Sequence, residues 1–538
     1  MVKKLAITIA GAVSLGSFEA GVMYEVIHAI REHNKRASSD DQIVIDVLTG
    51  ASAGGMTAAV TANKLMFEQA ALEGPYENVL YKAWVTDIDI SNLLGVYDGD
   101  SDTKSVFSSG YIEKLSQLYI TSRYGAAPPP AADKHPAAGD KIWLGLAMSN
   151  LNGVDYGLTT STGEFVCTCF QDSLVRLVEN TKVVDSLDFW ETVRKAAVSC
   201  GAFPFAFRPV DVERQPSEYQ SPNLESQIKA GQSFCYTDGG TFQNQPLGMT
   251  KNLVDMLDPT HRDTADRYYL FVSPHDKKSV AASDLNAGNA DFIPFAKHIF
   301  SAVYDQSQFQ DWITAEDVNK QIALLDARAS QLGKLLAGHP QDTALVRAAS
   351  QVLLSALFPG VNSQSPESNA INDAKGRLKA AYADECATLS EEERDVLIDC
   401  VLVLETAAGL GEKDEMKILG IIANESELAG AALSAFSGFF DIRYRRHDYD
   451  LGRIKARKFL SANCPLGLFD YEQDRIEIDE NLNGLKVDQM DGHVRETVYD
   501  GLKDRIMKIL AVAGLNWAER EGLFSFVIER RLKKVLGL

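Results

Sequence analysis

Ser52 stands in the pattern Gly-x-Ser-x-Gly, formed by Gly50-Ala51-Ser52-Ala53-Gly54. The residues before it, 42–48, are β-branched and apolar, which predicts a buried strand. The residues after it, 56–66, are rich in alanine and free of glycine and proline, which predicts a helix. A serine on such a strand-to-helix turn is exposed as a nucleophile, and the helix N-terminus favours developing negative charge. The alternative is a serine that only caps the helix. The flanking elements favour the nucleophile.

A small, flexible loop, Gly11–Gly16, lies one element upstream. It follows a predicted strand over residues 4–10 and precedes a predicted helix over residues 18–30. This order makes a βαβ unit with a right-handed crossover, so the two strands should be parallel in one sheet. Both loops then lie at the carboxyl edge of the sheet, where ligands of α/β proteins bind. The upstream loop is therefore placed to offer backbone N–H groups to an oxyanion.

Two other interpretations compete for this N-terminal region. Met1-Val2-Lys3-Lys4 and the apolar run to Leu15 resemble a secretory signal peptide. The glycines and the immediate continuation into an amphipathic helix fit a fold element better. A phosphate-binding loop is disfavoured, because no Lys-Ser or Lys-Thr follows the glycines and no complete Gly-x-Gly-x-x-Gly is present.

A third pattern is Asp238-Gly239-Gly240, within residues 236–246. Taken alone it is typical of a surface turn. Together, the three patterns resemble the patatin-like phospholipase family, which has a glycine-rich oxyanion loop, a Gly-x-Ser-x-Gly elbow and an Asp-Gly-Gly motif. The stretch 196–204 and the residues Asn244 and Pro246 match softer parts of the family pattern. The resemblance covers the first half of the chain, and three ordered motifs are far more specific than one.

The resemblance implies an α/β fold: a three-layer α/β/α core with a mainly parallel sheet, followed by a largely helical C-terminal half. It implies hydrolysis of carboxylic esters of lipids, of the phospholipase, lysophospholipase or carboxylesterase type, with no cofactor and no metal. The reaction would pass through an acyl-enzyme on a dyad of Ser52 and Asp238. The resemblance assigns the oxyanion hole to Gly11, Ala12, Val13 and Gly16. It assigns support of the elbow and of the aspartate to Gly50, Gly54, Gly239, Gly240 and Asn244.

The loop departs from the family pattern at two positions. The family usually has three consecutive glycines in this loop, whereas this chain has Gly11, Ala12 and Val13. A β-branched residue disfavours positive φ, so we expect Val13 in the β or α region, or donors from neighbouring peptides. Leu15 stands where the family usually has arginine or lysine. This weakens the expectation of a phospholipid substrate more than that of ester hydrolysis.

A catalytic triad is the alternative to the dyad. His275 follows a predicted strand over residues 268–272, and the order Ser52, Asp238, His275 is that of α/β-hydrolases. In that fold, however, several strands normally precede the elbow, whereas here it follows the second recognisable one. The dyad is therefore favoured, and with it an activity that does not depend on an imidazole titrating near about pH 6.5.

Composition fits a large enzyme of the cytoplasm. The chain has 538 residues, a net charge of −21 and 45% hydrophobic residues. The acidic charge argues against nucleic acid and against general attraction to anionic membranes. No apolar run is long enough to span a bilayer. We therefore expect a cytoplasmic protein that binds a lipid or ester substrate and contacts membranes at most peripherally. The seven cysteines show neither a zinc pattern nor a disulfide framework, which predicts free, mostly buried thiols.

The rest of the chain suggests three segments: a catalytic domain over 1–280, a helical extension or lid over 281–435, and a mixed or helical segment over 436–538 that packs back on the core. In the first segment, a strand over 141–148 should end in a turn over 149–153, residues 165–170 should form an edge strand, and 209–232 should be a polar excursion. Helices are expected over 293–336, 344–357, 371–387 and 390–408.

Two C-terminal stretches are ambiguous. Residues 436–459 interleave aromatic and basic side chains, which would suit an anionic headgroup or, as the favoured alternative, an ion-paired surface. Residues 524–538 form a basic amphipathic helix that would lie on a membrane or dock on the core. Two functions stay open: a serine acyl hydrolase, and a non-catalytic lipid- or protein-binding relative of the same fold.

Overall fold

The chain divides into two compact parts. Unit 1 comprises Met1–Leu253, Ala265–Gln310 and Ile418–Leu538, and unit 2 comprises Val254–Thr264 and Asp311–Lys417. Except for 254–264, unit 2 lies inside the 281–435 segment that the sequence suggests as a helical extension. The computed structural model describes residues 2–100, 105–125, 129–160, 163–219, 228–257, 266–274, 299, 302–303, 306–307, 310–358, 366–408, 416–461, 464–468, 471–512 and 514–538.

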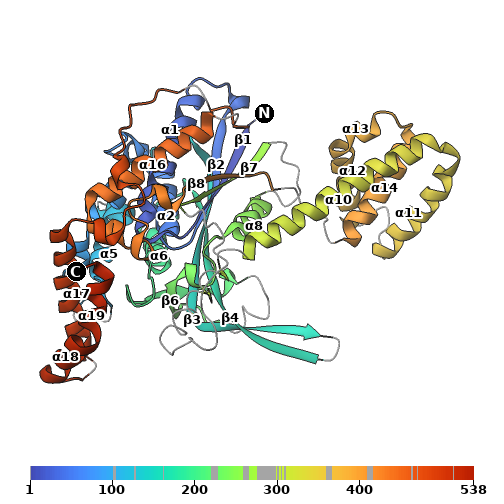
Figure 1. Ribbon diagram of the computed structural model, residues 1–538. Helices are drawn as coiled ribbons and strands as arrows, with labels where there is room; N and C mark the ends of the chain where they lie inside the picture. The colour runs from blue at the N-terminus through green and yellow to red at the C-terminus, as the bar shows by residue number, and fades with distance from the viewer. Residues whose placement is uncertain are drawn as a thin grey trace. The chain divides into compact units, whose positions relative to one another are not determined.

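Unit 1 is built around one mixed sheet (Figure 1). Over the described residues its strand order is β5-β6-β3-β2-β1-β7-β8, and β4 pairs with β3 outside that path. The pairs β3–β2, β2–β1, β1–β7 and β7–β8 are parallel, whereas the pairs of β3 with β4 and β6, and of β5 with β6, are antiparallel. The expected α/β core with a mainly parallel sheet is confirmed. The strands are β1 (Lys3–Ile9), β2 (Ile43–Gly50), β3 (Ala138–Thr160), β4 (Gly163–Glu179), β5 (Val210–Arg214), β6 (Gln232–Asp238), β7 (Asp266–Ser273) and β8 (Ile418–Ile422).

The first two strands form the predicted βαβ unit. β1 pairs in parallel with β2, and Ile9 lies opposite Gly50 at their carboxyl ends. The helix between them is α1 (Gly16–Asn34), and α2 (Ala53–Phe67) follows β2. The loop after β1 and the elbow after β2 therefore start side by side at one edge of the sheet. Residues 3–9 form a strand between β2 and β7, which is the fold element favoured over a signal peptide.

Two local expectations in the first segment were wrong. The predicted end of the strand at residues 149–153 is not there: β3 continues to Thr160, because β4 pairs with it on both sides of an irregularity between Ser149 and Val154. The polar stretch 209–232 contains β5, which pairs antiparallel with β6. Along β5 the side chains of Val212 and Arg214 are buried in alternation with exposed ones. The expected edge strand over 165–170 belongs to β4, which forms a long hairpin with β3 (Figure 1).

Over its described residues unit 2 is helical, as its sequence predicts, whereas most of residues 293–309 of the first predicted helix lie outside the described residues. It contains α10 (Gln310–Gly338, which begins at the boundary), α11 (Thr343–Leu357), α12 (Pro366–Ala381), α13 (Ala383–Cys386) and α14 (Glu391–Ala407). Ala329, Leu378, Val396 and Val401 belong to a buried apolar cluster confined to these helices. Unit 2 therefore has a core of its own.

The C-terminal stretch of the chain is part of unit 1. It contains α16 (Ile442–Ser461), α17 (Gly492–Val512), α18 (Trp517–Leu523) and α19 (Glu529–Leu536). In the aromatic and basic stretch, Arg445 and Arg453 are buried rather than placed on a surface, so they do not face an external headgroup. Leu536 of α19 is also buried, which favours docking of this helix over a membrane. Among the described residues, no helix is long and apolar enough to cross a bilayer.

The cysteines are free but less buried than expected. Cys200, Cys386 and Cys464 are buried, Cys167 is exposed, and the other three are intermediate. Cys167 lies on β4 opposite Tyr156 of β3, and among the described strands β4 pairs with β3 alone, which agrees with its exposure.

Candidate active site

The elbow after β2 holds Ser52 in an uncommon backbone conformation. Its φ is 52° and its ψ is −129°, at the residue that precedes α2. Such a conformation is costly for a residue with a side chain and persists only where neighbours enforce it. Here the neighbours are close: a Cβ added at Gly50 would overlap the backbone of Gly54, and one at Gly54 would overlap the carbonyl oxygens of Ile9 and Ala10. The glycines of the motif are therefore required by packing.

Asp238 lies at the end of β6 and is fully buried. Its backbone N–H donates to the Ala202 carbonyl over 3.0 Å, and its carbonyl accepts from the Ser149 hydroxyl over 2.8 Å. Its Oδ1 accepts from the Gly240 N–H over 2.7 Å. A Cβ added at Gly239 would overlap the Ala147 carbonyl, so the turn after Asp238 packs directly on β3. The carboxylate is thus fixed from both sides.

Ser52 and Asp238 meet directly. The Ser52 hydroxyl donates to Asp238 Oδ2 over 2.7 Å. Ser52 makes no side-chain cap on α2, so it is not merely a helix cap, and the burial of Asp238 excludes a surface turn. Burial raises the pKa of Asp238 from 3.8 to about 7, opposed by the hydrogen bonds from Ser52 and the Gly240 N–H. A carboxyl group with a pKa near neutral is suited to accept and return a proton.

Gly11 and Asn244 connect the loop after β1 with the turn after β6. The Gly11 N–H donates to the Asn244 carbonyl over 2.9 Å, and the Asn244 amide donates back to the Gly11 carbonyl over 3.4 Å. A Cβ added at Gly11 would overlap the Asn244 amide and lie 3.0 Å from the Ser52 Cβ. Gly11 thus packs against both, while its N–H is engaged with Asn244.

The expectation for Val13 was wrong. Its φ is 52°, in the left-handed region that β-branched residues avoid. Steric preference alone would keep it in the α or β region, so the surrounding contacts impose this conformation. Leu15, in place of the family cation, is completely buried. Gly16 begins α1, and a Cβ there would lie 2.7 Å from the Trp84 ring.

The backbone N–H groups near Ser52 differ in their engagement. The Gly16 N–H points back to carbonyls of its own turn, η1 (Val13–Leu15). Over the described residues, the N–H groups of Ala12, Val13 and Ala53 have no acceptor. Val13 and Ala53 also line the same cavity as Ser52. Ala53 was missed in the sequence, although the residue after the nucleophile of an elbow is a general source of an oxyanion donor.

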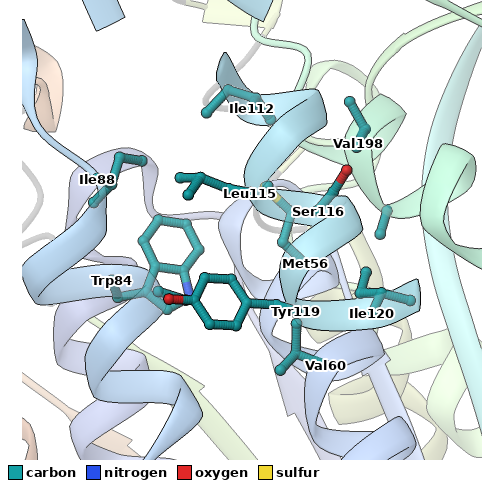
Figure 2. A pocket seen from close by; sticks show the side chains of 12 residues that line it. Met56, Val60, Trp84, Ile88, Ile112, Leu115, Ser116, Tyr119, Ile120 and Val198 are labelled. Carbon is teal, nitrogen blue, oxygen red and sulfur yellow. The ribbon is translucent and has the colours of Figure 1, made fainter. Parts of the chain in front are cut away.

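Apolar space adjoins the Ser52 hydroxyl. A pocket with about 400 Å³ of empty space, part of it open to solvent, is lined by Val13, Ser52, Ala53 and Phe439, among others. A second pocket, with about 480 Å³ of empty space that also includes its opening to solvent, shares Met56, Trp84, Ile88 and Ile112 with the first. Figure 2 shows this second cavity, with Met56 and Val60 of α2 facing Trp84 and Tyr119. Its lining contains no charged side chain, and the two pockets share an apolar wall formed by the four residues common to both.

Other candidate groups do not join this site in the part of the chain that can be described. His275 lies outside the described residues. Among the described His, Cys, Asp and Glu side chains, no group of three or more converges as metal ligands would. The Cys200 thiol, which lies beside Gly55 of the elbow, donates to the Ala147 carbonyl over 2.8 Å, and burial raises its pKa well above its usual value. That thiol is therefore held protonated.

Comparison with known proteins agrees with this geometry. Residues 7–251 match the family described as patatin-like phospholipase. A curated relative, the uncharacterized protein y4iI of Sinorhizobium fredii, is 25% identical over 348 residues. That similarity covers 50% of this chain and 49% of the relative, so the match spans about half the length of each. The family match contains the loop after β1, the elbow and Asp238, but ends before β7.

Proposed function

We propose that this protein, whose residues 7–251 belong to the patatin-like phospholipase family, is a serine-dependent hydrolase of lipid carboxylic esters. Ser52 is the nucleophile and Asp238 its general base. The observation that carries the proposal is the 2.7 Å hydrogen bond from the Ser52 hydroxyl to Asp238 Oδ2 at the mouth of an apolar cavity. Family membership supports lipid acyl hydrolysis in general, and the pair of side chains supplies the chemistry.

In the first half of the reaction, Ser52 attacks the ester carbonyl carbon as Asp238 Oδ2 takes its proton. The carbonyl oxygen becomes an oxyanion, and the unengaged N–H groups of Val13 and Ala53 are the donors best placed to stabilise it. The C–O bond to the alcohol then breaks, and the alcohol leaves with the proton from Asp238. The acyl group stays on Ser52 as an ester.

In the second half, water replaces the alcohol. Asp238 takes a proton from water as its oxygen attacks the acyl-enzyme carbonyl. The tetrahedral intermediate then collapses, the bond to Ser52 breaks, and Asp238 returns the proton to the serine oxygen. Because Oδ1 is engaged with the Gly240 N–H, Oδ2 carries the proton in both halves.

The cavities favour a substrate with an apolar acyl chain. An acyl group on Ser52 enters the cavity lined by Met56 and Phe439, and its chain continues past Trp84. Burial of each methylene contributes about 0.8 kcal/mol, which favours long chains over acetyl esters. At the family's cation position, buried Leu15 offers no charge to a phosphate, and we therefore propose that the acyl chain contributes more to recognition than a phosphate headgroup does.

The β3–β4 hairpin supports peripheral contact with a lipid surface. Phe165, Val166 and Phe170 are exposed on it, and Phe170 lies against Phe242, with ring centroids 6.3 Å apart. Phe242 follows Asp238 by only one turn, so this apolar group continues to the site. Loss of binding to neutral phosphatidylcholine vesicles in Phe165→Ser/Phe170→Ser, with unchanged hydrolysis of a soluble ester, would support this contact; unchanged vesicle binding would contradict it.

An active-site label tests the proposed nucleophile. A fluorophosphonate probe should label the wild-type protein stoichiometrically and should not label Ser52→Ala. Ser350→Ala is a matched control, because Ser350 is a buried serine in unit 2 that donates to the Arg347 carbonyl. A folded wild-type protein that takes no label, and hydrolyses none of a panel of phospholipids, lysolipids, acylglycerols and p-nitrophenyl esters, would instead be a binding module.

His275→Ala separates the dyad from a triad. With Asp238 as the direct base, this variant should keep turnover within a few-fold of wild type. In a triad the histidine is the base, and its loss should cost about 10⁴-fold or more. An inactive but folded His275→Ala protein would therefore reject the dyad while leaving Ser52 as nucleophile.

A further inference from the structure

We propose that the C-terminal segment 429–440 and helix α16 position the oxyanion loop, and that Ser14, Arg445 and Asp448 are positioning residues for the hydrolysis at Ser52. This inference rests on the proposed function. The segment, called here the C-terminal brace, lies far outside the family match over 7–251. It gives a role to the buried members of the aromatic and basic stretch late in the chain, among them Arg445 and Asp448.

The brace contacts the oxyanion loop directly. The buried Ser14 hydroxyl donates to the Ala435 carbonyl in a short hydrogen bond. A Cβ added at Gly438 would overlap the Ser14 hydroxyl, and one added at Gly430 would lie 3.2 Å from Leu15. Two glycines of the brace therefore allow its backbone to lie against the two residues that follow Val13.

Asp448 of α16 holds the start of the brace. It is fully buried, and its two oxygens accept from the N–H groups of Ala429 and Gly430 over 2.7 and 2.9 Å. His447 Nδ1 lies 3.1 Å from the same carboxylate, and its Nε2 lies 2.9 Å from Asn483 Oδ1. One carboxylate thus fixes both Ala429 and Gly430, the second of which packs next to Leu15.

Arg445 holds the end of the brace. Its guanidinium is buried and donates to the Phe439 carbonyl over 2.9 Å and to the Gly438 carbonyl over 3.2 Å. Its Nε donates to the Val85 carbonyl over 2.9 Å, in the π-helical turn η4 (Lys82–Asp87) that carries Trp84. Phe439 lines the cavity at Ser52 and Trp84 lines both cavities. Arg445 therefore joins the brace to the cavity wall.

Helix α16 is itself fixed on α1, the helix that continues from the loop. A Cβ added at Gly21 of α1 would overlap the Tyr449 carbonyl, and one added at Gly452 of α16 would overlap that of Phe18. Arg453 of α16 forms a fully buried ion pair with Glu25 of α1, with 3.0 Å between Nε and Oε2. The loop is thus held at its far end by α1 and along its length by the brace.

The brace is needed because the backbone of the oxyanion loop is strained at Val13. Val13 at φ 52° is unfavourable on its own, and such residues persist where surrounding contacts outweigh the cost. The brace carries strain too: Leu433, Ser434 and Ala435 have φ of 56°, 54° and 65°. The Ser14–Ala435 hydrogen bond joins the two strained segments. Without it, the Val13 N–H would move away from the position an oxyanion needs.

Ser14→Ala tests the proposal with the full-length protein. It should lower kcat about tenfold to a hundredfold with little change in KM, because small displacements of catalytic groups have effects of this size. Ser350→Ala should leave kcat unchanged. Gly438→Ala should also lower kcat, by pushing on Ser14. Since both changes act at one contact, their combined loss should be smaller than the product of the single losses.

Hydrogen-exchange mass spectrometry gives a readout that does not need activity. In Ser14→Ala and Asp448→Asn, peptides covering residues 10–20 should exchange faster, while peptides of β1 and α2 keep the wild-type rate. Unchanged exchange at 10–20 with unchanged kcat would overturn the proposal, and so would a uniform increase over unit 1. If the wild-type protein hydrolyses no ester but exchange at 10–20 still rises, the proposed function fails and the brace stands as support of the loop.

Discussion

Ser52 and Val13 have the same φ, 52°, and lie at the ends of two adjacent parallel strands. Both line the cavity at the site. They differ in what enforces the strain. At Ser52 the contacts are local, from Gly50 and Gly54 within the same motif and from the end of β1. At Val13 they come from a segment more than 400 residues later, through Ser14 and Ala435.

This difference has a consequence for the two roles. The conformation of the elbow is enforced by contacts within and next to its own motif, so its chemistry depends on Ser52, Asp238 and the glycines around them. The conformation of the oxyanion loop is maintained by contacts with the C-terminal part of unit 1. Substitutions at the elbow should therefore abolish the reaction, whereas substitutions in the loop should weaken it by degrees.

Asp238→Asn should have the largest effect after loss of Ser52 itself. The amide can still accept a hydrogen bond from Ser52, but it cannot accept the proton, so turnover should fall about 10⁴-fold. Ester hydrolysis and fluorophosphonate labelling measure this loss. Retention of more than about one per cent of activity in the folded variant would remove Asp238 as the base.

The raised pKa of Asp238 predicts how the activity depends on pH. Because the base must be ionised, kcat/KM should rise with pH and level off above about 7. Since this lies close to an imidazole pKa, a pH profile alone does not separate the dyad from a triad, contrary to the expectation from the sequence. His275→Ala is needed for that purpose.

The same pKa shift predicts a stability effect. The folded-state pKa of Asp238 is raised from 3.8 to about 7, so its contribution to folding is lost as pH rises through that interval. Asp238→Asn does not titrate. The Tm of this variant relative to wild type should therefore be higher at about pH 8.5 than at about pH 5. An equal difference at both pH values would mean that the carboxyl is not buried as described.

Gly11→Val should have the next largest effect. The added side chain would overlap Asn244 and press on Ser52, displacing loop and elbow together. Turnover should fall about 10²-fold or more, the scale of one lost oxyanion donor. Gly376→Ala in unit 2, where an added Cβ meets nothing within 4 Å, is the control. Wild-type kinetics in a folded Gly11→Val protein would place the oxyanion hole elsewhere.

Local contacts at Ser52 and distant contacts at Val13 also decide which parts of the site could be predicted from the sequence. The βαβ unit and the elbow depend on short motifs and strand order, and they could be predicted; the contact of Ser52 with Asp238 was expected only through the family resemblance. The conformation of Val13 could not, because its own side chain argues against positive φ and the contacts that impose it are distant. The burial of Arg445 and Asp448 was equally hidden, since a charged stretch is usually solvated.

Val60→Trp should change specificity more than rate. Val60 lines the second pocket, which Figure 2 shows, and does not line the pocket at Ser52. A larger side chain there should lower kcat/KM for long acyl esters about tenfold or more and leave short esters nearly unchanged, because only long chains reach it. A chain-length series of p-nitrophenyl esters measures this. An equal loss for all chain lengths would show that the acyl chain does not enter this cavity.

Val13→Gly should have the smallest effect, and it tests the comparison most directly. Glycine adopts positive φ without the cost of about 1–3 kcal/mol that a side chain incurs, but it gains about 0.5–1 kcal/mol of conformational entropy in the unfolded state. If the brace imposes the conformation, removing the strain should leave kcat within about threefold and Tm unchanged or slightly higher. Val13→Ala, which loses the same contacts but keeps positive φ unfavourable, should be less stable than Val13→Gly.

A Val13→Gly protein that loses more than about tenfold in kcat would mean that the valine side chain, rather than the imposed backbone conformation, holds the donor in place. Ser14→Ala combined with Val13→Gly then decides the point: once the strain is gone, the hydrogen bond to Ala435 should matter less than it does in the wild type.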